Sequence, residues 1–179
     1  MTHQCKNGLV HIYCGDGKGK TTAAMGLITR ALGHGWRVLL VQFLKNGRSG
    51  ELATLRKLPG VQIIAGQVTG KFSIAMSDQE KAATRALHLD FFRTAVAAVG
   101  HENTDLLVLD EILGAIESGL MDEAALLSFL DSKPASLEVV LTGRVASGSL
   151  LERADYISRI ACVRHPYQRG IMAREGIEY

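Results

Sequence analysis

Apolar runs of strand length recur along the chain, separated by amphipathic stretches and by short clusters of turn-forming residues. Several runs, such as RVLLVQFL and DLLVLDE, are apolar at almost every position, which is typical of strands covered on both faces. The pattern predicts strands at 8–14, 37–44, 61–65, 105–111, 137–143 and 156–163.

The stretches between these runs favour helices. Residues 20–32 are rich in Ala, Leu and Met, and Gly33 provides a stop signal. Ser77 and Glu80 form a capping box at the start of a long helix that ends at Gly100. Shorter helices are predicted before Leu58, at 121–131 and at 150–154.

The alternation of strands and helices predicts an α/β fold with a parallel sheet, because parallel strands need a crossover connection that is usually helical. No internal repeat, low-complexity tract or linker interrupts the pattern. A length of 179 residues suits one domain with one sizeable core, so we interpret residues 1–179 as a single domain.

The composition is that of a globular protein, with 47% hydrophobic and 21% charged residues. A balance of 20 basic against 18 acidic residues makes no electrostatic case for nucleic-acid binding. No apolar run approaches the ~18 residues of a membrane span, and the polar N-terminus is unlike a signal peptide. Three widely spaced cysteines suit neither a disulfide framework nor a zinc site, so we expect a cytoplasmic protein with reduced thiols.

The stretch YCGDGKGKTTAAMG, at 13–26, leaves a predicted strand and enters a predicted helix, which is the context of a phosphate-binding loop. Its glycines allow backbone N–H groups to converge on an anion, and the helix N-terminus adds positive potential. Lys20 supplies a charge for the outer phosphates, and the Thr21 hydroxyl is a natural Mg²⁺ ligand. The usual first glycine of the motif is replaced by Cys14.

Polar residues at the ends of two other predicted strands complete a nucleotide site. Asp110 and Glu111 follow the run LLVL, where a phosphate-loop protein needs a carboxylate for its metal. Thr142 and Arg144 end the run VVLTGR, at the edge where open α/β sheets bind ligands. A solvated acidic cap and a surface arginine are the alternatives for these two pairs.

The chain resembles the ATP:corrinoid adenosyltransferases of the BtuR/CobA type. The loop GDGKGKTTAAMGL, the segment VQFLKNGRSGE, the strands LLVLDEI and VVLTGR, and the C-terminus RHPYQRGIMAREGIEY match that family's segments in order. The resemblance spans nearly the whole chain and implies a P-loop NTPase (RecA-like) three-layer fold with a mostly parallel sheet of about six strands.

The resemblance also implies an unusual reaction of ATP. A reduced corrinoid, with cobalt as Co(I), attacks the ribose 5′-carbon, and triphosphate leaves. Lys20, Arg144 and Glu111 are expected to assist the reaction, and Thr21, Asp110 and Glu111 to hold Mg²⁺ or Mn²⁺. The residues expected to bind the substrates are Gly15, Asp16, Gly17, Lys18, Gly19, Lys20, Thr21, Thr22, Arg144 and Phe72.

As partners the resemblance implies ATP, a reduced corrinoid, an electron donor such as a flavoprotein, and a second copy in a homodimer. Two positions depart from the family pattern. Leu113 stands where members often carry Asn or Thr, and the segment around Phe72 and Ile74 lacks the tryptophan that helps some members displace the lower cobalt ligand. An ordinary core anchor is the alternative for Phe72.

The phosphate loop by itself leaves two other functions open. A P-loop nucleoside kinase would share the loop and the acidic strand, and it would also need a base beside the acceptor hydroxyl. A regulatory ATP-binding module would share the binding residues and have no chemistry.

Overall fold

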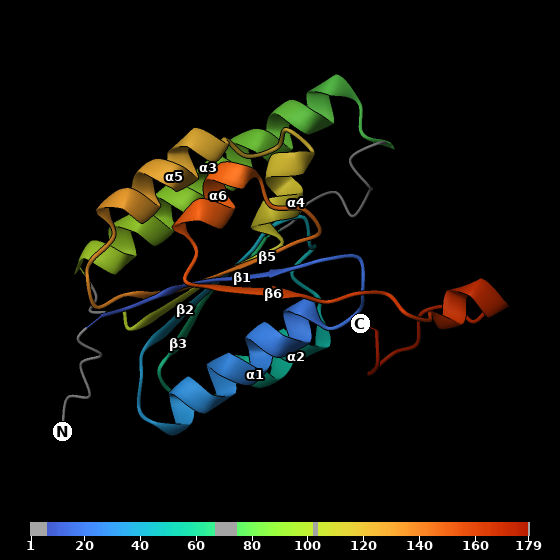
Figure 1. Ribbon diagram of the computed structural model, residues 1–179, viewed down its shortest axis with the longest axis horizontal. Helices are drawn as coiled ribbons and strands as arrows, with labels where there is room; N and C mark the ends of the chain where they lie inside the picture. The colour runs from blue at the N-terminus through green and yellow to red at the C-terminus, as the bar shows by residue number, and fades with distance from the viewer. Residues whose placement is uncertain (1–6, 67–74, 102–103, 179) are drawn as a thin grey trace.

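A computed structural model describes residues 7–66, 75–101 and 104–178, apart from the side chain of residue 101. Its six strands form one sheet in the order β3-β2-β4-β5-β1-β6, and every neighbouring pair is parallel (Figure 1). The strands are β1 (Val10–Cys14), β2 (Val38–Gln42), β3 (Val61–Ile64), β4 (Leu106–Asp110), β5 (Glu138–Thr142) and β6 (Tyr156–Arg159).

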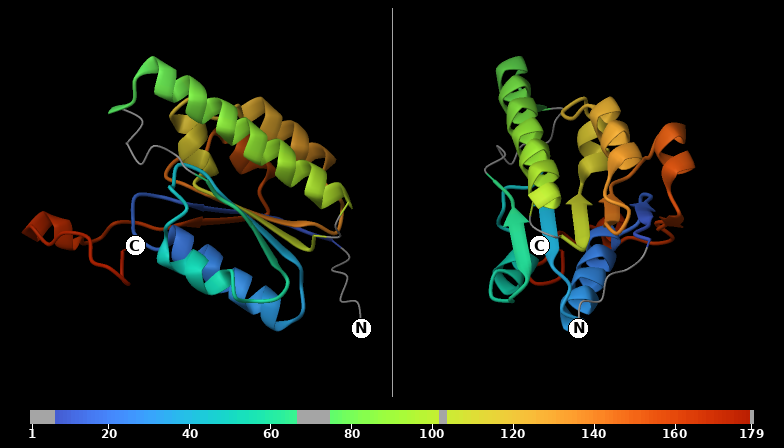
Figure 2. Two further views of the ribbon diagram at one scale, coloured as in Figure 1. Left: turned by 180° about the vertical axis from the view of Figure 1, so that it is seen from behind. Right: turned by 90° about the vertical axis from the view of Figure 1, so that its left-hand side faces the viewer.

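Helices cover both faces of this sheet, so the fold has three layers (Figures 1 and 2). The helices α1 (Lys20–Gly33) and α2 (Gly50–Leu55) lie on one face. The opposite face carries α3 (Asp78–His101), α4 (Ile112–Glu117), α5 (Glu123–Ser132) and α6 (Gly148–Arg153). The predicted α/β fold with a parallel sheet is confirmed.

The core lies on both sides of the sheet because side chains alternate along each strand. Ile12 and Leu109 belong to the cluster that packs against α3, α4, α5 and α6. Leu40 and Val108 point to the other side, where they pack against α1 and α2. β2 and β4 are buried at every position, which explains why their sequences are continuous apolar runs.

Every predicted strand is present, and each is one to four residues shorter than predicted. The capping box is also confirmed: the Ser77 backbone N–H donates to Glu80 Oε2 at 2.8 Å, and the Glu80 N–H donates to Ser77 Oγ at 3.2 Å. α4 was not predicted from the sequence. It follows β4 after a single residue, Glu111, so the apolar run continues from strand into helix without a turn signal.

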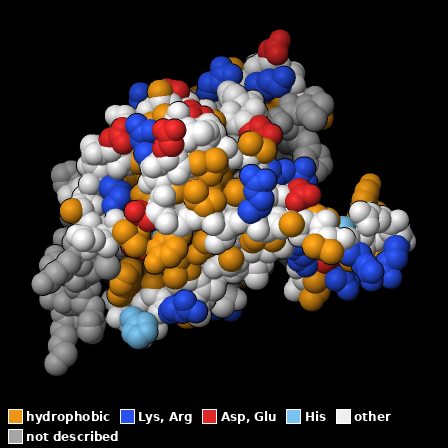
Figure 3. Space-filling model, viewed as in Figure 1, with side chains coloured by type: hydrophobic (Ala, Val, Ile, Leu, Met, Phe, Trp, Pro, Cys, Tyr) orange, Lys and Arg blue, Asp and Glu red, His pale blue; other side chains and the backbone are white. Residues whose placement is uncertain are grey.

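Beyond β6 the chain leaves the sheet and forms a projecting segment with the short 3-10 helix η2 (Pro166–Arg169), coloured red in Figure 1. Lys and Arg side chains gather on this projection (Figure 3). Among the helices within the described residues, none combines the length and apolar character that a membrane span needs.

We predict that Leu107→Ala destabilises the protein by about 2–5 kcal/mol, the usual result of truncating a buried leucine. Leu107 is fully buried at the centre of the sheet. Urea denaturation measures the free energy of unfolding, and Leu58→Ala, at a side chain that is 37% exposed, is the matched control. Equal losses in the two variants would contradict this description of the core.

Candidate active site

The glycine-rich loop between β1 and α1 is shaped by close backbone contacts. The Gly15 N–H donates to the carbonyl of Arg144 at 2.8 Å, and the Gly17 N–H donates to the carbonyl of Ile160 at 2.9 Å. Gly15 has a φ of 110°, and a Cβ there would lie 2.3 Å from the Ile160 oxygen. Glycine is therefore required at this position by both conformation and space.

The loop ends at the N-terminus of α1, and Lys20, the first residue of that helix, supplies a positive charge. Gly19 has a φ of 117° and forms the N-cap of the helix, whose first turn contains no acidic residue. The Lys20 Nζ donates to the Gly17 carbonyl at 2.7 Å, so the ammonium group lies over the loop. A helix N-terminus and a lysine at one loop form a site for anionic phosphate groups.

Asp110, at the end of β4, is the centre of a buried polar cluster. Its Oδ1 accepts hydrogen bonds from the hydroxyls of Thr21 at 2.9 Å and Thr142 at 2.8 Å. Its Oδ2 accepts from Lys45 Nζ at 2.7 Å and Gln42 Nε2 at 3.2 Å. The Asp110 side chain has no exposed surface, and the four donors satisfy its charge.

Glu111 lies next to this cluster in an unusual backbone conformation. Its φ is 64°, and its N–H donates to Thr142 Oγ1 at 2.8 Å. Burial raises the pKa of the Glu111 carboxyl, and the Asp110 charge raises it further, while Lys45 and other nearby cations oppose the shift. Left-handed backbone at a non-glycine residue is a strained feature that is common at functional sites.

The residues predicted to bind a metal fit a magnesium site. Thr21 and Asp110 are hydrogen-bonded to each other, and Glu111 follows Asp110 directly. Within the described part of the chain, no three His, Cys, Asp or Glu side chains gather as a metal cage. Mg²⁺ at a nucleotide is usually held by one or two carboxylates together with the phosphates, so a complete protein cage is not required.

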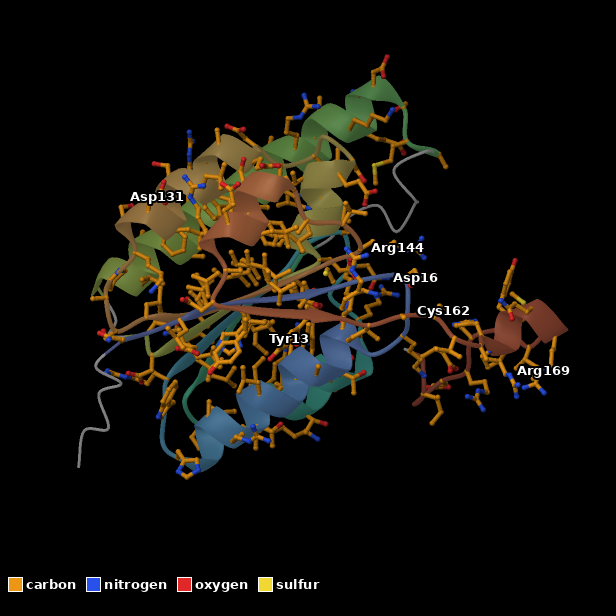
Figure 4. The ribbon with its side chains drawn as sticks, viewed as in Figure 1. Tyr13, Asp16, Asp131, Arg144, Cys162 and Arg169 are labelled. Atoms are coloured by element: carbon orange, nitrogen blue, oxygen red, sulfur yellow. The ribbon has the colours of Figure 1, made fainter. Side chains whose placement is uncertain are left out.

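Arg144 and Asp16 lie near each other at the carboxyl end of the sheet (Figure 4). The Asp16 Oδ1 accepts a hydrogen bond from the Cys162 N–H at 3.1 Å. That bond and a bond from its own backbone N–H lower the pKa of Asp16, with smaller contributions from Lys20 and Arg144. The Arg144 side chain is exposed to solvent, where it can reach a ligand.

The C-terminal segment also contacts the phosphate loop through a charged pair. Lys18 Nζ donates to Glu178 Oε1 at 2.9 Å, and Arg174 Nη2 donates to the same oxygen at 3.2 Å. Hydrogen bonds from these two cations and from the Arg174 backbone lower the pKa of Glu178 to about 2. The carboxylate is therefore charged at neutral pH and forms an ion pair with Lys18 at the surface of the protein.

The structure brings together some of the predicted site residues. Thr21, Asp110 and Thr142 form one hydrogen-bonded group, which joins the start of α1 to the ends of β4 and β5. Thr22 is exposed on α1, and Phe72 and Ile74 lie outside the described residues.

Sequence reasoning did not assign roles to Lys45, Gln42 or Glu178. Gln42 lies directly opposite Asp110 in the β2–β4 register, so the strand-end argument applied to VQFLK would have indicated Gln42 and Lys45. No local pattern indicates Glu178, because its partner Lys18 is 160 residues away in the sequence.

Phosphate loops of this kind, combined with a buried acidic strand end, belong to P-loop nucleotide-binding proteins. The family model described as ATP:corrinoid adenosyltransferase BtuR/CobO/CobP matches residues 6–179, and the chain belongs to this family of transferases.

Similar curated proteins include corrinoid adenosyltransferases of two bacteria. That of Pseudomonas aeruginosa is 32% identical over 97% of this chain and 85% of its own length. That of Escherichia coli K12 is 30% identical over 98% of this chain and 88% of its own length.

Solved structures with a similar fold are much larger proteins. The cytoplasmic domain of EssC matches with a TM-score of 0.54 and 15% identity over 93% of this chain and 34% of that chain. Thermomonospora curvata EccC (ATPases 2 and 3), in complex with a signal sequence peptide, matches with a TM-score of 0.52 and 21% identity over 94% of this chain and 33% of that chain. At this level of identity the likeness supports the P-loop ATPase fold alone.

The raised pKa of Glu111 predicts a pH-dependent stability. Above its usual pKa of 4.5 the folded protein retains a proton that the unfolded chain has lost, so the free energy of unfolding falls as pH rises. We expect Glu111→Gln to raise the melting temperature at pH 7.5 and to change it little at pH 4. Glu117→Gln, at an exposed position on α4, should act alike at both pH values. A Glu111→Gln effect independent of pH would contradict the shift.

Proposed function

We propose that the protein transfers the 5′-deoxyadenosyl group of ATP to the Co(I) ion of a reduced corrinoid, in the synthesis or salvage of adenosylated corrinoids. The Co(I) electron pair forms a bond to C5′, the C5′–O5′ bond breaks, and its electron pair leaves with triphosphate. Cobalt is thereby oxidised formally to Co(III). Adenosylation of corrinoids with ATP is the chemistry of the family; the cobalt oxidation state and the leaving group are the finer steps proposed here.

The observation that carries this proposal is the position of the cations around the phosphate loop. Lys20 lies over the loop, Lys18 lies on it, and the carbonyl of Arg144 is bonded to it. Because Co(I) is itself the nucleophile, the protein needs to hold C5′ in line and to stabilise charge on the leaving triphosphate. We assign the latter role to Lys20 and Arg144, with Lys18 as a further phosphate contact.

Thr21, Asp110 and Glu111 would hold Mg²⁺ or Mn²⁺ beside the phosphates. The bound ion would neutralise charge on the triphosphate. Glu111 suits this role because its raised pKa reflects a partly buried carboxyl close to a second carboxyl, an arrangement that a divalent cation stabilises. The glycine loop with Asp16 and Thr22 would bind the nucleotide around this centre.

The corrinoid side of the reaction rests on the family resemblance. We propose that Phe72 contacts the corrinoid and helps to exclude its lower ligand. We also propose an electron donor such as a flavoprotein, a cytoplasmic location and a homodimer. The absence of a strong net charge, at +2, supports small-molecule substrates over nucleic acid.

The decisive experiment is product analysis after incubation with ATP, Mg²⁺ and a chemically reduced corrinoid. We expect triphosphate together with the light-sensitive spectrum of an alkylcobalt product. ADP would instead indicate a P-loop kinase or an ATPase, and binding without turnover would indicate a regulatory ATP-binding module.

Lys20→Ala should reduce kcat/KM for ATP by roughly 10²–10³-fold, the usual cost of removing one preorganised charge from such a site. Lys57→Ala, at an exposed position after α2, removes the same charge far from the loop and should have little effect. Steady-state kinetics with reduced corrinoid measures both. Wild-type values in Lys20→Ala would overturn the phosphate-loop assignment.

Phe72→Ala tests the corrinoid side separately. We expect a larger loss with a Co(II) substrate and a biological reductant than with pre-reduced Co(I), because removal of the lower ligand matters for the reduction step. The affinity for ATP should change little, since the phosphate loop is untouched. Equal losses in the two assays would leave Phe72 with a packing role.

A further inference from the structure

We propose that the ammonium group of Lys45 occupies the binding position of the divalent cation in the nucleotide-free protein. When the metal binds together with ATP, this ammonium group moves to the triphosphate. The inference rests on the metal site proposed above and assigns a function to Lys45. Lys45 would thus be a nucleotide-positioning residue that also makes metal binding depend on ATP.

The first observation is the set of atoms that Lys45 contacts. Its Nζ lies 2.7 Å from Asp110 Oδ2 and 3.1 Å from Thr21 Oγ1, which are two of the proposed metal ligands. The Thr21 hydroxyl donates its proton to Asp110 and accepts from Lys45, so the ammonium group lies in the space between the two oxygens that an ion bound to both would occupy. A metal ion on Thr21 and the Lys45 ammonium cannot share this position.

Electrostatics supports the same conclusion. A divalent ion between Thr21 and Asp110 would face the Lys45 charge at contact distance in a partly buried site, where repulsion between like charges is strong. Asp110 is fully buried, and Lys45 is the only positively charged group among its four hydrogen-bond donors in the described part of the chain. The lysine therefore neutralises a carboxylate that would otherwise be buried without a counter-ion.

The backbone beside Lys45 is fixed, while the side chain has room to move. The Phe43 N–H donates to the Asp110 carbonyl at 2.9 Å, and the Leu44 N–H donates to His88 Nε2 at 3.2 Å. Leu44 has a φ of 57°, a strained conformation that directs the chain after β2 toward the site. The Lys45 side chain is 26% exposed, in contrast to 0% for Asp110, so its head can leave the carboxylate without unfolding the loop.

The bond from the Leu44 N–H to His88 does not depend on where the Lys45 side chain lies. His88 is fully buried, and its Nδ1 faces the Leu120 carbonyl at 3.2 Å, which requires a proton on Nδ1 and leaves Nε2 as the acceptor for Leu44. Burial lowers the pKa of His88, in agreement with the neutral ring.

A triphosphate bound on the loop before Thr21 would be a strong anion close to the displaced Lys45 ammonium group, and it would accept charge-assisted hydrogen bonds from it.

The test measures Mn²⁺ binding by electron paramagnetic resonance, with and without ATP and in the absence of corrinoid. In the nucleotide-free state, Lys45→Met should bind Mn²⁺ at least about tenfold more tightly than the wild type, because the competing charge is gone. Lys57→Met, which removes an exposed lysine after α2, is the matched control and should behave as the wild type. Titration with Mg²⁺–ATP should show weaker nucleotide binding by Lys45→Met.

A second variant and a second readout keep the test valid if Lys45→Met folds poorly. Lys45→Gln removes the charge but keeps a hydrogen-bond donor for Asp110. Mn²⁺ alone should raise the melting temperature of both variants and leave that of the wild type nearly unchanged. Equal Mn²⁺ affinities of the nucleotide-free wild type and both variants would overturn the inference, provided that the wild type binds Mn²⁺ with ATP. Failure of the wild type to bind Mn²⁺ even with ATP would overturn the metal site itself.

Discussion

The site is organised around one buried negative charge, the carboxylate of Asp110. A buried carboxylate is costly unless it is paired and hydrogen-bonded. Its four donors come from different parts of the chain: Thr21 at the start of α1, Gln42 at the end of β2, Lys45 after β2, and Thr142 at the end of β5. Strand order and register must therefore be correct for the charge to be satisfied, which links the stability of the sheet to the integrity of the site.

The phosphate loop depends on a second set of contacts, made by segments distant in the sequence. The carbonyls of Arg144 and Ile160 hold the N–H groups of Gly15 and Gly17, so the ends of β5 and β6 support the loop on both sides. Asp16 and Lys18 then bind the C-terminal segment through Cys162 and Glu178. The edge strand β6 and the residues after it thus support the candidate phosphate loop, although the residues of β6 are exposed and contribute little to the core.

The charges of the site suit the proposed reaction, in which the site must stabilise the negative charge of the leaving triphosphate. Cations lie along the loop, and the two carboxylates lie together beyond it. Adjacent carboxylates at a P-loop are suited to a divalent cation, whereas a triphosphate alone would be repelled by them. The arrangement suits the proposed reaction, in which Co(I) is the nucleophile and the protein supplies no base.

The amino-acid sequence alone was enough to predict the α/β fold and a candidate phosphate-binding loop. Continuous apolar runs are typical of strands buried on both faces. The glycine-rich loop that ends in Gly19, Lys20 and Thr21 is typical of the connection between a strand and a helix in phosphate-binding proteins. The structure was needed to show that Lys45 and Gln42 both donate to Asp110, and that Lys18 donates to Glu178. The helix α4 was also missed, because it begins one residue after a strand of the same apolar character. Hydrophobic periodicity is a local property of the chain, whereas the partners of a buried charge are set by which strands become neighbours.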